Sequence, residues 1–557
     1  MFVRIKSSPN SPRKAVQLVE SSRNAQGQVR QRIVRHIGIA NDAKELRQLQ
    51  EVAEVAKASL ANQAQPYLFH PEEIAELAVA ARQRPPDPDE PLRVDLKQLE
   101  EDQRILVGVH EVCGALYEEL GLGSVLRNPA RKKASVRNLR HIVLARLANP
   151  QSKRFSVDDL ARRFGVELSL PGVYRMMDQL DEEAVARLKD RARNAAEKLF
   201  KERIRVVFYD CTTLYFESFT PDDLKQNGYS KDLKFSQPQV LLALLVTPEG
   251  LPLGYEVFPG ATFEGHTLKL ALEQIRRQWA VEEIVVVADS AMLGQANLAL
   301  LESSGYRYVV AARLKNLPDE LKAHVLERAQ YQNCAGESHD ALRELDYGQG
   351  RRLVISYSKQ RARKDAHERQ DALRRLTKRL AKSRNPTAHL KGGGTAKFLR
   401  LEGPGTLAVD EARVAEAARW DGLRGVVSNL SDQSPADLLS QYHGLWKIEE
   451  CFRVSKTDLR IRPIFHWTPK RVRAHLAICF MALLLIRHLE YRLRLQIGPL
   501  SPAAIIRHLL TVQVSILRHC SQPHRYALPS NPSREAEQIY RASGLRLSRT
   551  PYRLPPV

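Results

Sequence analysis

Two short apolar runs, each ending in an aspartate, constrain the fold of this chain more than any other feature. IRVVFYDC begins at Ile204 and EEIVVVADSAM begins at Glu282, and their aspartates are Asp210 and Asp289. Runs of this length, rich in β-branched and aromatic residues, predict buried strands. Aspartate has a low strand propensity. A carboxylate at such a strand end is therefore either a cap for a turn or helix, or a functional group.

The stretch YHGLWKIEECFRVSK, residues 442–456, adds a third carboxylate. On a helix at about 100° per residue, Tyr442, Glu449 and Lys456 share one stripe, because they are seven residues apart. A glutamate on a partly apolar face is costly to bury unless a cation or a metal compensates its charge. The alternative is an amphipathic helix on which Glu449 forms a surface ion pair with Arg453 or Lys456.

Taken together, the three carboxylates suggest a metal-dependent reaction at phosphorus. Side chains from two strand ends and one helix can converge on hard divalent cations, and Mg²⁺ takes only a few carboxylates while keeping its waters. A pair of such ions can activate an attacking oxygen and stabilise the leaving oxygen. For either aspartate alone, a capping role stays open.

With their flanking residues, these acids resemble the DDE transposases of bacterial insertion sequences. The resemblance is to the branch marked by Y-x2-R-x3-E-x6-K, the IS-four-like superfamily, with a β-rich insertion before the glutamate. Tyr442, Glu449 and Lys456 match this signature, whereas Leu445 stands at the arginine position. Further matches are YDCTTLYFES, GYSKD, EGLPLGYEVFPGATFEGHT and RPIFHWTPKRVRAH. The resemblance covers roughly residues 200–490 well.

The resemblance implies a DNA transposase in which Asp210, Asp289 and Glu449 bind two Mg²⁺ ions, with Mn²⁺ as a substitute. Such an enzyme nicks the ends of its element and joins the freed 3′-hydroxyls to target DNA. The resemblance also implies that Tyr442 and Lys456 hold terminal phosphates. We expect a homodimer on double-stranded DNA, in the bacterial cytoplasm and associated with the nucleoid.

Two other functions stay open at this stage. A ribonuclease H-like nuclease would cleave DNA without joining it. A domesticated descendant of a transposase would bind DNA without cleaving it, although the intact acids disfavour this reading. Terminal inverted repeats on either side of the gene would favour a mobile element.

The charge of the chain agrees with a polyanionic partner. The formal net charge is +22 and the pI is about 9.8. Residues 451–500 carry ten Lys or Arg side chains against two acids, directly after Glu449. This segment predicts a phosphate-binding surface that fixes position without reading sequence. Arg471 and Arg473 are its candidates for DNA contact.

Two further residues of the signature helix are candidates for DNA contact. Trp446 could stack on a displaced base, although a tryptophan at helical spacing is more often a core residue. Arg453 lies about 40° from Glu449 on the helix, on the side away from Leu445. It could therefore supply the cation that Leu445 lacks, and a structural ion pair with a neighbouring acid is the alternative.

The remaining composition argues against metal-binding cysteines and against a membrane protein. The six cysteines are scattered without Cys or Cys/His metal spacing, which suggests a reduced, cytosolic chain. The N-terminus has no apolar run of the kind that starts a signal peptide. The most apolar stretch, residues 474–486, is too short to span a bilayer comfortably and predicts a buried helix of the core.

The N-terminal part divides into three segments. Residues 1–81 predict strands at FVRIK, KAVQLVESS and VRQRIVRHIG, followed by a helix from about residue 41 to 61, and residues 82–96 form a proline-rich linker. Residues 97–200 are mainly helical. They contain a possible helix-turn-helix with Ser156 as N-cap, Gly165 in the turn, and Tyr174 and Arg175 on the second helix. Helical hairpins of this kind are also common outside DNA binding.

The rest predicts an interrupted α/β catalytic core. Residues 201–311 form its first part, with three antiparallel strands followed by alternating helix and strand, and residues 426–498 form its second part. The resemblance makes this a ribonuclease H-like fold. Residues 312–425 form an α+β insertion with a basic helical run from residue 359 to 384. Residues 499–557 are a basic C-terminal tail without an assignment.

Overall fold

The computed structural model describes residues 2–8, 11–23, 29–40, 94–217, 220–228, 237–263, 285–290, 294–333, 341–382, 394–403, 406–522 and 524–554, with scattered positions in 46–57 and 267–273. The chain splits into two compact units. One is built on the first 98 residues, and the other spans Leu99–Leu554.

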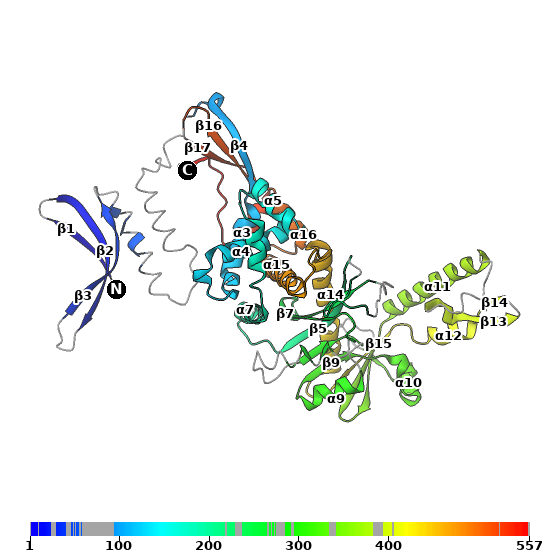
Figure 1. Cartoon of the computed structure of the whole chain (residues 1–557). Coiled ribbons are helices and arrows are strands. Elements are labelled where there is room, and N and C mark those ends of the chain that lie inside the picture. The colour runs from blue at the N-terminus through cyan, green and yellow to red at the C-terminus, as the bar shows by residue number, and fades with distance from the viewer. Residues whose placement is uncertain are drawn as a thin grey trace. The chain divides into compact units, whose positions relative to one another are not determined.

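The N-terminal unit is a three-stranded antiparallel sheet (Figure 1). Its strands β1 (Phe2–Ser8), β2 (Ser11–Arg23) and β3 (Val29–Ala40) lie in the order β1-β2-β3 and confirm the three predicted strands. Val16 and Leu18, which alternate along β2, are fully buried. The described positions between 46 and 57 are helical, as expected, whereas the predicted linker at 82–91 lies outside the described residues.

A nine-stranded sheet in the order β10-β11-β12-β15-β9-β8-β5-β6-β7 forms the centre of the second unit. β5, β6 and β7 pair antiparallel. β8 pairs parallel to β5 and β9 pairs parallel to β8, with helix α9 (Gln295–Ser303) between β8 and β9 in the chain. This is the element order expected from the sequence. The core strands are β5 (Val206–Tyr215), β6 (Gln239–Val246), β7 (Pro252–Pro259), β8 (Val285–Ala288) and β9 (Arg307–Ala311).

Alternation along the strands divides the interior into two cores. Val207 and Tyr209 of β5 point into one core with α9, and Phe208 points into the other. The core that contains Phe208 is covered by α13 (Pro435–His443), α14 (Trp446–Arg453) and α15 (Pro469–Gln496). Because these strands are covered on both faces, their sequences are nearly continuous apolar runs.

The predicted insertion extends the core sheet instead of standing apart from it. β11 and β12 pair with each other, and β12 pairs with β15, which in turn pairs with β9. Helix α11, strands β13 and β14 and helix α12 form an outer lobe, in which Arg369 binds Asp421 through two hydrogen bonds of 2.5 and 2.6 Å. The bounds are α10 (Asp319–Leu326), β10 (Gln332–Asn333), β11 (Ala341–Gly348), β12 (Arg351–Tyr357), α11 (Lys359–Lys382), β13 (Leu399–Gly403), β14 (Thr406–Val409), α12 (Glu411–Ala418) and β15 (Leu423–Ser428).

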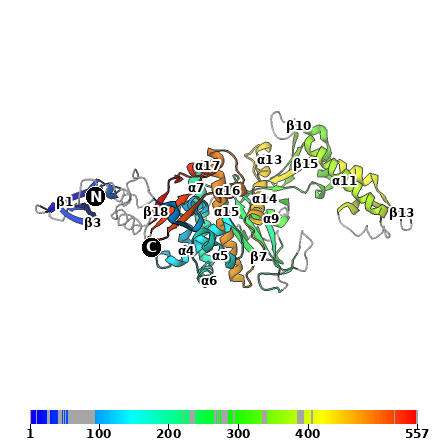
Figure 2. The same cartoon turned by 90° about the horizontal axis from the view of Figure 1, so that it is seen from above.

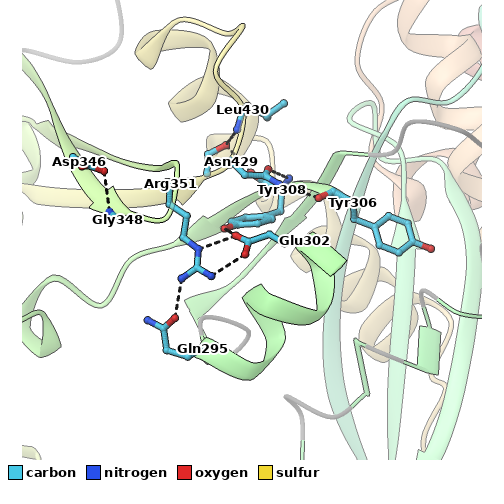
Figure 3. Close-up of polar contacts among 10 residues, drawn as sticks. Gln295, Glu302, Tyr306, Tyr308, Asp346, Gly348, Arg351, Asn429 and Leu430 are labelled. Carbon is cyan, nitrogen blue, oxygen red and sulfur yellow. Dashed lines mark hydrogen bonds and ion pairs between the residues drawn. The ribbon is translucent and has the colours of Figure 1, made fainter. Parts of the chain in front are cut away.

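Polar contacts fasten the inserted strands to the core (Figure 3). The Arg351 guanidinium, which is buried, donates to both carboxylate oxygens of Glu302 at 2.7 and 2.8 Å, and the Tyr308 hydroxyl donates to the same carboxylate. The Asn429 side chain accepts from the Tyr308 N–H and donates to the Tyr306 carbonyl. These bonds hold β15 against β9, because both strands end at this network.

The region from Leu96 to Phe200 is mostly helical, with one exception to the expectation. Residues 99–106 form a strand, β4, and helices follow. The helices are α3 (Gly108–Glu119), α4 (Lys133–Ala148), α5 (Lys153–Phe164), α6 (Leu170–Met177) and α7 (Glu182–Phe200).

The predicted helix-turn-helix is present as α5 and α6, but its first cap is misplaced. Gly165 ends α5 in the left-handed conformation, at φ 65°, and Ser169 caps α6 by accepting the Gly172 N–H. Ser156 is not the N-cap. Ser152 is, because its side chain accepts the Phe155 N–H at 3.2 Å, whereas Ser156 is buried inside the helix.

The expected C-terminal tail is a folded part of the second unit. Its strand β16 pairs antiparallel with β4, so that residues 513–519 complete a sheet begun at residues 99–106 in the order β18-β17-β16-β4 (Figure 1). The elements are α16 (Pro502–Leu509), β16 (Gln513–His519), β17 (Arg525–Pro529), α17 (Arg534–Ala542) and β18 (Tyr552–Leu554).

Helix α15 is the main packing element of the second unit (Figure 2). It contacts α3, α4 and α7 of the helical region as well as β7 of the sheet. Among the described residues it is the one helix long and apolar enough to cross a membrane. Within its apolar stretch of 18 residues, 94% is buried inside the protein. The predicted buried core helix is thus confirmed.

Candidate active site

The two aspartates are neighbours in the sheet, but only one lies at a strand end. Asp289 follows the last residue of β8, whereas Asp210 lies in the middle of β5 (Val206–Tyr215), because β5 continues past the apolar run that predicted it. β5 and β8 are parallel with Tyr209 opposite Ala288, so the next residues, Asp210 and Asp289, follow at the same level. Neighbouring strands lie about 4.8 Å apart. Each carboxylate accepts the N–H of the following residue, from Cys211 at 2.8 Å and from Ser290 at 2.5 Å.

Alternation directs both aspartates to the same face. Tyr209 and Ala288 belong to one core, and Phe208 and Val287 belong to the other. Because side chains alternate along a strand, Asp210 and Asp289 point to the face of Phe208 and Val287. That face is covered by α13 and α14, which carry Tyr442 and Glu449.

Close packing sets the distance between α14 and β5. Gly444 lies at the junction of α13 and α14, and a Cβ at this position would stand 2.6 Å from the Phe208 ring. A side chain would not fit here. Gly444 therefore lets the helix that carries Glu449 approach the strand that carries Asp210.

The stretch from 442 to 456 is not one uniform helix, in contrast to the expectation. Tyr442 lies in α13, Glu449 in α14 and Lys456 in a π-helical turn, Val454–Asp458. Bonds such as Leu445 N–H to the Tyr442 carbonyl tighten the junction, and the π turn widens the end. Glu449 is exposed, which agrees with a group that faces a cleft.

Tyr442 lies within the electrostatic field of all three acids. The pKa of its phenol is raised to about 12, first by burial and then by the charges of Asp289, Glu449 and Asp210. The positive charge of Arg424 acts against them. One half-buried hydroxyl is thus subject to the fields of all three carboxylates.

The donor chemistry of this set suits a hard divalent cation, since carboxylate oxygens are the ligands that Mg²⁺ prefers. Asp210 and Asp289 are also at one level and on one face, as such a site requires. Across the described residues, however, no group of three His, Cys, Asp or Glu side chains stands close enough to hold a metal ion.

Lys456 contacts the strand that carries Asp210. Its ammonium donates to the Thr212 hydroxyl at 2.6 Å, and Thr212 follows Asp210 by two residues on the same face of β5. A π-helical turn is often found at functional sites. Here it brings the half-buried Lys456 back to the sheet.

The other predicted contacts on α14 differ in their surroundings. Trp446 is 51% exposed and has the Lys447 ammonium 4.0 Å from its ring, so its aromatic face lies at the surface and not in the core. Arg453 is exposed but forms ion pairs of 3.5 Å with Asp458 and 3.9 Å with Glu450. The structural alternative for Arg453 is therefore the arrangement observed.

The predicted contacts outside α14 are mostly occupied by protein partners. Arg471 binds both oxygens of Asp178 at 3.0 and 3.1 Å and lies 4.7 Å from the Tyr174 ring, which joins α15 to α6. Arg473 donates to the Val257 carbonyl at 3.3 Å. Arg175 is exposed on α6. The structure places none of these four residues beside the three acids.

A cleft of about 590 Å³ opens beside Glu449 and contains cations that the sequence analysis did not identify. Tyr442, Trp446 and Glu449 line one side, and the end of β9 and the start of β15 line the other. The overlooked cations are Arg313, Lys315 and Arg424. The pattern of β15 offered one signal, since Arg424 alternates with the buried Val426 on the strand GLRGVVSN.

Comparisons with known proteins identify relatives of this chain. A family model described as "Transposase DDE domain" matches residues 201–485, and one described as "IS1634 family transposase, N-terminal domain" matches residues 3–66. No curated protein matches the sequence.

Solved structures add more distant similarities. A synaptic complex of the piggyBac transposase with hairpin DNA is 10% identical, with 69% of this chain and 70% of that chain covered and a TM-score of 0.35. A paired-end complex of the Mos1 transposase with the left transposon end is 13% identical, with 46% and 72% covered and a TM-score of 0.14.

Proposed function

Because this chain belongs to the DDE transposases of insertion sequences, we propose that it nicks the ends of its own element and joins the freed 3′-hydroxyls to target DNA. We assign strand cleavage and joining to Asp210, Asp289 and Glu449, on a core of ribonuclease H-like strand order. The observation that carries this assignment is that Asp210 and Asp289 lie at the same level on neighbouring parallel strands. The charges of all three acids also act on the phenol of Tyr442.

The acids would hold two Mg²⁺ ions, or Mn²⁺ as a substitute. When bound, such a pair of ions lowers the barrier to attack at phosphorus by activating the attacking oxygen and stabilising the leaving one. The protein side chains bind and orient. Tyr442 and Lys456, on either side of Glu449, would hold the phosphates of the terminal nucleotides, and Trp446 offers an exposed ring for a displaced base.

Double-stranded DNA is the partner in this proposal, both as element end and as target. The net charge of +22 favours binding of a polyanion and predicts an affinity that falls steeply with salt. Two element ends must be brought together before both can be joined to one target. We therefore propose a homodimer on DNA.

The test is incubation of the purified protein with labelled duplexes that carry the element's ends, in the presence of Mg²⁺. Asp210→Ala, Asp289→Ala and Glu449→Ala should each abolish cleavage and leave end binding largely intact, since a lost metal ligand affects charge stabilisation in the reaction more than duplex docking. Cleavage without joining would instead identify a nuclease. Binding without cleavage by the wild type would identify a domesticated DNA-binding protein.

Glu450→Ala is not a neutral control, although Glu450 points away from Glu449. Its carboxylate forms a 3.1 Å ion pair with the buried Arg487, so its removal would weaken the core. Glu411→Ala, which removes an exposed acid from the first turn of α12, is a better control. Near-normal cleavage by any of the three acid variants would refute the assignment.

A further inference from the structure

Arg424 is a cation that lines the cleft beside Glu449. Its side chain is exposed at the second position of β15. Within the part of the chain that the structure describes, no carboxylate lies within ion-pair distance of it. An arginine that lines a cleft beside three carboxylates, and pairs with none of them, is available to a ligand.

Strand register places Arg424 opposite the acids. Val426 of β15 pairs with Ala311 of β9, and Val310 of β9 pairs with Ala288 of β8. Asp289 is therefore level with Val426, and Arg424 lies two residues further towards the end of the sheet from which the acids project. Two strand spacings of about 4.8 Å across the sheet, combined with a rise of about 3.4 Å for each of two residues along the strand, give roughly 12 Å between the backbones of Arg424 and Asp289. This width leaves room for a phosphate group between the two side chains.

The side chain of Arg424 also points to the face of the sheet on which such a phosphate would lie. Val426 points into the core beneath α13 and α14, so Arg424, two residues away on the same strand, points to that face as well. The electrostatics of Tyr442 agree with this direction, because the charge of Arg424 lowers the pKa of the phenol, whereas Asp289 and Glu449 raise it. The Asn429 bonds join the end of β15 to the start of β9, and the bidentate Arg351–Glu302 pair joins the neighbouring strand β12 to α9 (Figure 3).

The alternatives on α14 are less suited to this role. Leu445, at the arginine position of the signature, is buried at 7% exposure. Arg453 is engaged with Asp458 and Glu450. Lys447 lies over the Trp446 ring. The cation whose charge acts on the phenol of Tyr442 therefore comes from the sheet and not from the helix.

We propose that Arg424 binds the DNA phosphate next to the scissile bond. In this chain β15 supplies the positive charge that the signature places on the helix at position 445. Arg313 and Lys315, which line the same cleft, extend the positive surface along the strand. The inference rests on the proposed transposase function and names the residue that holds its substrate at the site.

The test compares Arg424→Ala, Arg424→Lys and the wild type on end duplexes. One duplex has ordinary phosphates, and the others carry a neutral methylphosphonate at one of the positions around the scissile bond. Arg424→Ala should slow cleavage by about 10²- to 10³-fold, as for the loss of one donor to a developing anion. Arg424→Lys should be intermediate, because lysine keeps the charge but loses the bidentate fork.

The neutral phosphate tests for direct contact. At the contacted position, methylphosphonate should slow the wild type but cause no further loss in Arg424→Ala, since contacting groups are not additive. Arg541→Ala, which removes an exposed arginine from α17, is the control for net charge. The melting temperature of Arg424→Ala should equal that of the wild type, because no protein contact is lost.

Three results would overturn the inference. Arg424→Ala could cleave within threefold of the wild type, or its loss could add to that of methylphosphonate at every position. It could also melt earlier and lose binding as much as cleavage, which would identify a scaffold residue. In all three cases wild-type cleavage would leave the transposase function standing. Failure of the wild type to cleave would instead refute that function, and the inference with it.

Discussion

Replacement of Gly444 by alanine should damage the active site through packing alone. An alanine Cβ here would stand 2.6 and 2.9 Å from two carbons of the Phe208 ring, and Phe208 is 1% exposed in the core beneath α13 and α14. Real contacts of this kind are not found below about 3.0 Å. The ring or the helix must therefore move, and Asp210 and Glu449 lie on those two elements.

The expected magnitude follows from two opposing terms. Overpacking a filled core costs about 1–3 kcal/mol. The exchange of Gly for Ala in a helical conformation returns about 0.5–1 kcal/mol, and Gly444 has helical φ and ψ of −63° and −15°. The net destabilisation is therefore centred on about 1 kcal/mol, within a range of about 0–2.5 kcal/mol. Denaturant unfolding measures this cost, and cleavage of a labelled end measures the displaced acids.

A second substitution separates packing from other causes. Phe208→Leu removes ring atoms, so the double variant Gly444→Ala with Phe208→Leu should recover cleavage that Gly444→Ala alone has lost. Gly254→Ala is the matched control, because its Cβ would meet Lys189 at an ordinary 3.5 Å. Wild-type stability and cleavage in Gly444→Ala would refute the packing argument.

Two further predictions concern the interface between the helical region and α15. Burial lowers the pKa of Lys153 to about 7 from its ordinary 10.5. Between these values the unfolded chain binds the proton and the folded chain does not, so the free energy of unfolding should rise with pH from about 7 to 10. Lys153→Met should flatten that rise in melting temperature, and an unchanged slope would contradict the assignment. Arg471→Ala should lower the free energy of unfolding by about 1 kcal/mol, since its partly exposed pair with Asp178 and its contact with Tyr174 are each worth less than that. A normal stability combined with a flatter salt dependence of DNA binding would instead show that Arg471 binds phosphate.

The core strands and their acids could be predicted because the signal is local. A strand buried on both faces has a continuous apolar run, and Asp210 and Asp289 end such runs in the sequence. The end of the apolar run is also the end of the strand at Asp289, but β5 continues from Asp210 to Tyr215, so the strand end predicted at Asp210 was wrong. The three antiparallel strands β5, β6 and β7 could be predicted from apolar runs of the same kind. Caps are less certain, because Ser152 and Ser156 are both serines at the start of one helix and only the first has the required extended backbone.

The parts that sequence reasoning missed depend on contacts between distant segments. Arg424 reaches the acids only because the insertion returns to the sheet as β15 beside β9. The pairing of β16 with β4 joins residues that are far apart in the chain, and neither strand indicates its partner. The tightened junction at Gly444 and the π turn at Lys456 depend on packing against β5, which helical periodicity does not contain.

The pairing of β4 with β16 has a consequence for the synthesis of the protein. Residues 99–106 leave the ribosome early, but their partner strand, residues 513–519, is among the last segments made. At 5–20 residues per second the interval is on the order of 20–80 s. During this time β4 lacks the strand with which it pairs in the folded protein. A message cut short before the last strands would therefore yield a chain that holds all three of the proposed catalytic acids but lacks the strand that pairs with β4.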